Sequence, residues 1–239
     1  MKHHLLSVLA LFLPSVASAH VGLMPKPAPA KTSQVVTFAI NHGCKIQDAN
    51  DPLKEHELDT MSVQIDIPAG IDGKTVRAMP SDFGAKPEMT MDAEGAVTSI
   101  KWTRDVADLQ PADSLGYYEL SVKLSTPDAP YTQIPFVLTQ TCMDGVNPVT
   151  VLWEGGEPDP SPVLYVVPQQ HERGWNKLTL STAVAFDDFK YYFSDTLIIW
   201  KGKAAFSPNM AVAMLIGMTP GVTALDTDLA AGDEIWVKY

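Results

Sequence analysis

The sequence has little positive charge and few familiar catalytic motifs. Its 17 lysines and arginines face 28 aspartates and glutamates, a formal net charge of −11. A nucleic-acid binder needs a basic face to displace counterions from phosphate, so this charge argues against such partners. The chain has no G-x-S-x-G elbow, no H-E-x-x-H motif, no phosphate loop and no G-x-G-x-x-G. We therefore do not expect an enzyme.

Long apolar runs are also missing. The first 19 residues have the layout of a cleaved secretory signal: Lys2, a largely apolar stretch from Leu5 to Val16, and the small residues 17–19. That stretch is too short to cross a hydrocarbon core of about 30 Å as a helix, and no later segment reaches the length required. We expect residues 1–19 to be removed and the mature chain, beginning at His20, to be exported to a periplasmic or other extracytoplasmic compartment.

Only two cysteines are present, Cys44 and Cys142. In an oxidising compartment a lone pair of cysteines forms a disulfide more often than a metal site or a nucleophile. The bridge would close a loop of roughly 100 residues, for which the chain-entropy estimate is about 4.7 kcal/mol of stabilisation. It would join an early strand to a late one.

Nineteen prolines and 15 glycines indicate many short elements joined by turns. In residues 20–168, apolar residues alternate or cluster with β-branched and aromatic types, with turn-rich stretches at 41–52 and 154–162. The predicted strands are Gln34–Ile40, Met61–Ile67, Ala96–Trp102, Tyr117–Leu124, Gln133–Leu138 and Val149–Trp153. This spacing predicts an immunoglobulin-like antiparallel β-sandwich.

The pattern changes after residue 168. Residues 169–190 are polar and irregular, whereas 195–200 and 233–239 predict strands. Pro208 in the first turn predicts a helix from Ser207 to Gly217. We expect 169–239 to form a small α+β appendage packed on the sandwich, with its apolar strands, which carry three tryptophans (Trp175, Trp200 and Trp236), docked there.

Three methionines, Met210, Met214 and Met218, recur every four residues in the predicted helix. Thioethers select Cu(I). Because Leu215 and Ile216 belong to the same stripe, we expect instead the buried face of an amphipathic helix.

The residue that cleavage would expose, His20, offers two nitrogen donors. Its free α-amine and its own Nδ1 can close on one metal as a six-membered chelate. Their reference pKa values, about 7.7–8.0 and 6.5, allow a metal to displace both protons near neutral pH. Nitrogen donors in a plane, completed by an oxygen, suit Cu(II). The alternative is a cleavage site that merely happens to precede a histidine.

The run from residue 20 to 27, His-Val-Gly-Leu-Met-Pro-Lys-Pro, resembles the mature start of the YcnI-like copper-binding domain family, which begins His-Val-x-x-x-Pro. Further likeness lies in residues 38–44 (Phe-Ala-Ile-Asn-His-Gly-Cys, similar to a His-Gly-Cys variant), 117–120 (Tyr-Tyr-Glu-Leu), 140–142 (Gln-Thr-Cys) and 151–153 (Val-Leu-Trp). The resemblance covers 20–168 and implies an extracytoplasmic β-sandwich with a single-histidine copper brace.

The resemblance implies roles for three residues: His20 as bidentate ligand, Glu119 as carboxylate ligand and Trp153 close to the metal. Many members have Asn-Glu where this chain has Asn41-His42, so the ligand set can differ. From its strand pattern alone, Glu119 would be a solvated glutamate on a polar face, and Trp153 a core aromatic. An indole is no strong ligand, but it can shield a metal or contact it through its ring.

The other histidines have open roles. His42, two residues before Cys44, could be an additional imidazole ligand, a hydrogen-bond partner of the site, or a turn residue. His56 lies in a charged loop, where we expect it to be solvated. His171 is similar, with a role in the appendage left open.

We therefore expect an exported protein that holds Cu(II) in copper trafficking or homeostasis. Its partners would be the copper ion and a copper chaperone or a membrane copper transporter. The alternative is a copper-dependent oxidase resembling the lytic polysaccharide monooxygenases, which also begin with histidine on a β-sandwich. That alternative needs a second histidine, from His42 or His171, an open site for oxygen and a flat aromatic substrate face.

Overall fold

The computed structural model describes residues 21–239 except 49, 52, 85, 115, 146, 157 and 158. The expected signal peptide and His20 lie outside the described residues. Within this described part, no helix combines the length and the apolar character needed to cross a membrane.

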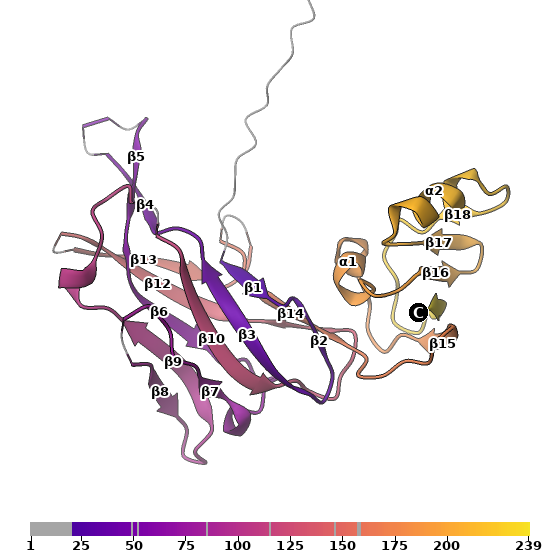
Figure 1. The fold of residues 1–239 in the computed structure, drawn as a ribbon, viewed down its shortest axis with the longest axis horizontal. Helices are drawn as coiled ribbons and strands as arrows, with labels where there is room; N and C mark the ends of the chain where they lie inside the picture. The colour runs from indigo at the N-terminus through magenta and orange to yellow at the C-terminus, as the bar shows by residue number, and fades with distance from the viewer. Residues whose placement is uncertain are drawn as a thin grey trace, which may run out of the picture.

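Residues 21–168 form a mainly antiparallel β-sandwich, on the left of Figure 1. One layer is the four-stranded sheet β1-β3-β10-β7, and the other is the five-stranded sheet β13-β12-β6-β9-β8. The first contains β1 (Gly22–Met24), β3 (Ser33–Ile40), β7 (Arg77–Ala78) and β10 (Tyr118–Ser125). The second contains β6 (Thr60–Asp66), β8 (Glu88–Met91), β9 (Val97–Thr103), β12 (Val137–Asp144) and β13 (Asn147–Trp153).

Two smaller sheets complete this region. The sheet β11-β14-β2 lies towards the C-terminal region in Figure 1, and β4 and β5 form a separate hairpin. Their bounds are β2 (Pro27–Pro29), β4 (Cys44–Gln47), β5 (Glu55–Leu58), β11 (Thr132–Pro135) and β14 (Val163–Val167). Two 3₁₀ turns, η1 (Gly73–Thr75) and η2 (Val106–Asp108), connect strands.

The sandwich core is built from the alternate residues that the strand pattern indicated. Phe38 and Leu120 from one layer, and Ile65, Ile100 and Trp102 from the other, are fully buried in one cluster. Alternation places every second side chain of a strand on the same face, so these positions meet between the layers. The predicted mainly-β, immunoglobulin-like class is confirmed.

The sequence prediction was wrong at two places in the sandwich. The predicted strand Gln133–Leu138 is broken at the buried Phe136, and its halves β11 and β12 belong to different sheets. Pro135, which has no backbone N–H, ends the first half. The turn-rich stretch 41–52 contains β4, whose polar sequence hid a strand that pairs with β5.

Residues 169–239 form a second, five-stranded sheet in the order β15-β19-β16-β17-β18, with two helices. The strands are β15 (Trp175–Thr179), β16 (Ile198–Lys201), β17 (Ala204–Phe206), β18 (Thr223–Ala224) and β19 (Glu234–Lys238), and the helical elements are η3 (Phe186–Asp188), α1 (Phe189–Tyr192) and α2 (Met210–Met218). The expected strands at 195–200 and 233–239 are present as β16 and β19. The stretch 169–190 is more regular than its sequence indicated, since it holds β15 and η3.

A second apolar cluster joins this sheet to the sandwich. Tyr131 and Tyr165 of the sandwich belong to the same buried cluster as Tyr192 and Phe193 of the C-terminal region. The Tyr165 hydroxyl donates to Asp188 Oδ1 at 2.8 Å. Burial, together with this bond, raises the pKa of Tyr165. The contact is therefore made by tyrosines and α1.

The tryptophans of the C-terminal region do not form that contact. Trp175 and Trp236 are 48% and 47% exposed, whereas Ile199 of β16 and Ile235 and Val237 of β19 belong to the cluster that contains Tyr131 and Tyr165. On β19, Ile235 and Val237 are fully buried, and Trp236 lies between them on the opposite face. Side chains alternate along this strand, so Ile235 and Val237 face the core and Trp236 faces outward.

Helix α2 also differs from its prediction. Met210, Met214 and Met218 are 81%, 64% and 75% exposed, whereas Ile216 is buried. The segment is apolar on nearly every side, so periodicity could not select the buried face. Asn209 caps the helix, its Oδ1 accepting from two backbone N–H groups of the first turn, where we had expected the start at Ser207.

Candidate functional site

The predicted disulfide between Cys44 and Cys142 is present, with an S–S distance of 2.04 Å and Cα atoms 5.8 Å apart. The Cys44 backbone N–H also donates to Cys142 Sγ at 2.9 Å. The bridge joins β4 to β12 and is buried with Leu58 in a small apolar cluster. It therefore fixes the segment that follows β3 and carries His42.

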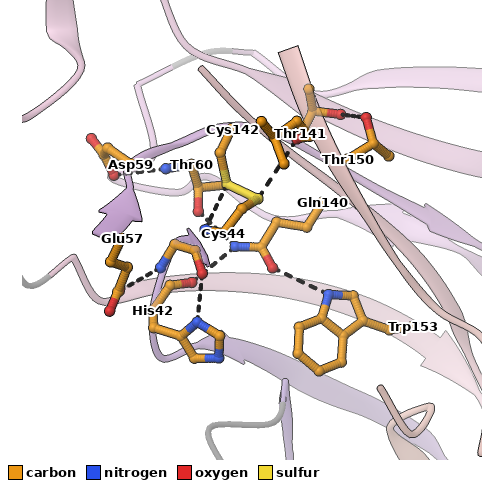
Figure 2. Close-up of a disulfide and its surroundings, with 12 residues drawn as sticks. His42, Cys44, Glu57, Asp59, Thr60, Gln140, Thr141, Cys142, Thr150 and Trp153 are labelled. Atoms are coloured by element: carbon orange, nitrogen blue, oxygen red, sulfur yellow. Dashed lines mark hydrogen bonds between the residues drawn. A yellow bond between two sulfur atoms is a disulfide. The ribbon is translucent and has the colours of Figure 1, made fainter. Parts of the chain in front are cut away.

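Gln140 lies beside this disulfide and holds three elements together (Figure 2). Its side chain is fully buried. Its Nε2 donates to the His42 carbonyl oxygen at 2.9 Å and to Thr60 Oγ1 at 2.8 Å, and its Oε1 accepts from Trp153 Nε1 at 3.1 Å. Both polar atoms of the buried amide are satisfied, as a stable interior requires. Gln140 thus fixes the backbone at His42 and the orientation of Trp153.

The His42 and Trp153 rings lie together, with centroids 6.1 Å apart in an edge-on arrangement. His42 Nδ1 bonds to the Gly43 carbonyl oxygen. A carbonyl only accepts, so Nδ1 carries the proton and the lone pair of the neutral ring is on Nε2. Metal-bound histidines commonly have this arrangement. Trp153 is buried, 3% exposed, and donates inward to Gln140.

Position 43 accepts only glycine, because the backbone there passes very close to β5. A Cβ at this position would lie 1.6 Å from the Leu58 carbonyl oxygen. Its N–H donates to Glu57 Oε1 at 2.7 Å. The close approach brings the segment at His42 against β5.

Glu119 is the second residue of β10, on the outer face of the four-stranded sheet. It is paired with Ala39 of β3, and Ala39 is paired on its other side with Gly22 of β1. Its carboxylate is exposed, as the strand pattern predicted, and its Oε1 accepts from the Tyr117 hydroxyl at 2.6 Å. This bond raises the pKa of Tyr117.

The start of the described chain lies in the same row. Val21 is buried, and Gly22 and Glu119 are two strands apart, so their Cα atoms are separated by about 10 Å. The backbone that leads to residue 20 therefore enters the sandwich at the end that carries Glu119.

A buried ion pair lies next to this end of the sandwich, in contact with Tyr118 of β10. Arg104 Nη1 lies 2.8 Å from Asp59 Oδ2, with the two side chains only 8% and 3% exposed. The Tyr118 hydroxyl donates to Asp59 Oδ1 at 2.7 Å, and burial raises the pKa of Tyr118. Asp59 also accepts from the backbone of Thr60, whose hydroxyl bonds to Gln140. The polar network is thus continuous from Arg104 to Trp153.

His56 is not simply solvated, as we had expected. Its Nδ1 lies 2.7 Å from Asp113 Oδ2 and its Nε2 lies 2.8 Å from Asp48 Oδ2. The hydrogen bond to Asp113, followed by the one to Asp48, raises the pKa of His56. The histidine therefore links the tip of the β4–β5 hairpin to the loop that contains Asp113. We call this contact between His56, Asp48 and Asp113 the hairpin clip.

His171 lies elsewhere. Its ring stacks on that of Tyr239, the last residue of the chain, with centroids 3.6 Å apart. The C-terminus, marked C in Figure 1, lies away from β4. The structure therefore brings Trp153 to His42 and does not bring His171 to them. Across the residues described, no group of three or more His, Cys, Asp or Glu side chains is placed to hold a metal; His20 was outside that set.

Sequence reasoning missed Gln140 as a site residue. Leu138, Gln140 and Cys142 occupy alternate positions of one strand and are all buried. An amide in the buried phase of an apolar strand must find partners inside the protein. The position of Gln140 between Leu138 and Cys142 on the buried face of the strand was therefore the sequence feature that could have identified it.

Two solved structures are similar to this chain in part. A protein from Nocardia farcinica, described as uncharacterized and immunoglobulin-like in fold, is 21% identical, with a TM-score of 0.46, covering 62% of this chain and 98% of its own. The sixth cohesin of Acetivibrio cellulolyticus scaffoldin B, solved with a Cel5 dockerin mutant, is 10% identical, with a TM-score of 0.28, covering 62% of this chain and 92% of its own. None of the curated proteins matches.

The family comparison is more informative. Residues 20–166, more than half of the chain, match the family described as "Domain of unknown function (DUF1775)". This is the YcnI-like domain family. The chain therefore belongs to the DUF1775 family, and residues 167–239 extend beyond the matched domain.

Proposed function

We propose that the protein is exported and holds Cu(II) at the end of the sandwich where β1 begins. Cleavage after residue 19 would give His20 a free α-amine, which with Nδ1 of the same ring makes a bidentate chelate. Glu119 would supply a carboxylate oxygen. The observation that carries this proposal is the row Gly22–Ala39–Glu119, which brings the entering chain to the carboxylate.

The surroundings of this end favour an ion site. The backbone at His42 and the Trp153 indole are both held by Gln140, so they need little reordering when a ligand binds. In the neutral ring of His42 the lone pair is on Nε2, the form suited to a ligand or to an outer hydrogen-bond acceptor. Trp153 would shield the metal from solvent. This set would hold an ion without any change in the fold.

The role we propose is copper trafficking or homeostasis. A site made from a chain terminus and surface carboxylate can exchange its metal with a partner, which would be a copper chaperone or a membrane copper transporter. The oxidase alternative has less support, because one of its two candidate histidines, His171, is stacked on Tyr239 in the C-terminal region. It would depend on His42 alone.

The test is a Cu(II) titration followed by paramagnetic resonance. Protein that begins at His20 is compared with protein that carries one extra residue before it. The extension replaces the primary amine by an amide, so we expect at least a hundredfold weaker binding and loss of the nitrogen-rich spectrum. Glu119→Gln should weaken binding less, by about tenfold. Equal affinities for the extended and mature forms would contradict the proposal.

A further inference from the structure

The outer face of the C-terminal sheet carries three tryptophans from three adjacent strands. Trp175, Trp236 and Trp200 come from β15, β19 and β16, which are neighbours in that order. Trp236 is directly opposite Trp200. With Gly202, the three residues line a shallow, mostly apolar pocket of about 520 Å³. Three of the five tryptophans of the chain thus gather at one surface.

These side chains are not needed to fill the core. The faces of β16 and β19 that point inward carry Ile199, Ile235 and Val237, all fully buried. Trp236 is half exposed on the other side of the same sheet. Contiguous aromatic surface left in water at a pocket indicates a ligand-binding surface.

The indoles have unused binding capacity. None of the three N–H groups donates a hydrogen bond to another described residue, and the rings do not stack on one another in the described part. Each therefore presents an apolar ring face together with a hydrogen-bond donor at its edge. A matching ligand has flat apolar faces bordered by oxygen acceptors.

The charges on this face select against a cation. Lys177 is paired across the strands with Trp236, and Lys238 Nζ lies over the Trp175 ring, 5.7 Å from its centroid. The nearby carboxylate of Glu234 is already paired with Lys177 at 2.8 Å. A quaternary ammonium ligand would therefore find the Lys238 ammonium group already over the Trp175 ring and the Glu234 carboxylate already paired.

We infer that Trp175, Trp200 and Trp236 form a binding site for a pyranose oligosaccharide. Pyranose rings have a face of C–H groups that stacks on indole and an edge of hydroxyl and ring oxygens that accepts from indole N–H. Their hydroxyls also accept from lysine ammonium groups. Trp200 and Trp236 are directly opposite each other, so two successive sugar rings would lie on these two indoles. Trp175, whose ring lies under Lys238, is diagonal to Trp236 and would border the site. Gly202, with a φ of +60° and no side chain, leaves one side of the site open.

A membrane surface is the competing occupant. A lipid-binding patch inserts side chains that project from the protein, whereas these indoles stand on the strands of a sheet. Trp175 and Trp236 are only about half exposed, and Trp200 is less exposed than either. This position suits a ligand that lies flat on the face.

The test is calorimetric titration of the full mature chain with hexasaccharides of glucose, N-acetylglucosamine, galactose and mannose. We expect at least one to bind, with Trp236→Ala and Trp200→Ala each reducing the affinity tenfold or more. The matched control Met214→Ala, which truncates an exposed apolar side chain of the same region, should leave the affinity unchanged. Circular dichroism confirms that each variant is folded.

Three results would overturn the inference. The first is failure of all four hexasaccharides to bind at millimolar concentration. The second is unchanged affinity in both tryptophan variants. The third is Trp236-dependent binding to vesicles of phosphatidylglycerol and phosphatidylcholine without sugar binding, which would assign the surface to lipid. A copper titration bears on none of these outcomes, because the pocket contains no residue of the proposed copper site.

Discussion

The end of the sandwich around Gln140 and the outer surface of the C-terminal sheet differ in the groups that they bury and expose. At the first, polar groups are buried and each is paired: Gln140 bonds to His42, Thr60 and Trp153. At the second, large apolar groups such as Trp236 are exposed. A satisfied polar interior holds backbone and rings in fixed positions, which suits an ion. An exposed aromatic surface suits a ligand with apolar faces.

The largest effect should come from the disulfide. In Cys44→Ala/Cys142→Ala the unfolded chain regains the freedom of a 98-residue loop. We expect about 4.7 kcal/mol lower stability in urea denaturation. Because this effect acts on the unfolded chain, the tryptophan surface should be unchanged while the variant is folded. A loss below about 1 kcal/mol would mean that the bridge is not what fixes this end.

Helix α2 gives a paired comparison within the C-terminal region. Ile216→Ala removes a buried side chain and should lower the free energy of unfolding by about 2–4 kcal/mol. Met214→Ala removes one that is 64% exposed and should change it by less than about 0.5 kcal/mol. Thermal or urea unfolding measures both. Equal losses would restore the interpretation of the methionines as a buried face.

Gln140→Leu tests the polar interior. The variant keeps a similar volume but leaves the Trp153 N–H and the His42 carbonyl oxygen without this partner. We expect a loss of about 1–3 kcal/mol. It should also weaken copper binding, because the backbone at His42 is no longer held. Unchanged stability in the leucine variant would show that the network does not fix the site.

The hairpin clip should respond to pH. The pKa of His56 is raised by its two carboxylate partners, so its contribution is complete below the ordinary pKa of about 6.5 and is lost as pH rises through the raised value. The pKa values of Asp48 and Asp113 are lowered, chiefly by backbone N–H donors, so their contribution is lost as pH falls through the lowered values. The clip should be tightest between these limits.

Amide hydrogen exchange of β5, corrected for intrinsic rates, measures this effect. Protection should be greater at pH 5.5 than at pH 8.5. In His56→Gln the difference should vanish, since glutamine does not titrate. A pH difference that persists in this variant would contradict the assignment to His56.

Much of the sandwich follows from alternation, and the exceptions have local causes. Strand β10 buries every second residue from Leu120 to Leu124, so its pattern predicts it. The hairpin β4–β5 has polar strands that depend on the disulfide and on His56, and no periodicity indicates it. In α2 the sequence is apolar on nearly all sides, so only the tertiary contact selects Ile216.

The site was predictable to a similar extent. The cysteine pair and the polar face of Glu119 follow from counting and alternation, and the structure agrees. The pairing of His42 with Trp153 needs Gln140, which lies 98 positions after His42 and donates to its carbonyl oxygen. The exposure of Trp236 was indicated by alternation, because Trp236 shares its strand face with Glu234 and Lys238 whereas Ile235 and Val237 share the other face.

The most direct test of the central claim is a crystal structure of the copper-loaded protein that begins at His20, with the metal located by anomalous scattering. The account predicts one copper bonded to the α-amine and Nδ1 of His20, with a Glu119 carboxylate oxygen in its coordination sphere and Trp153 alongside. Copper at α2, at the His56 clip or at any site without His20 would contradict it.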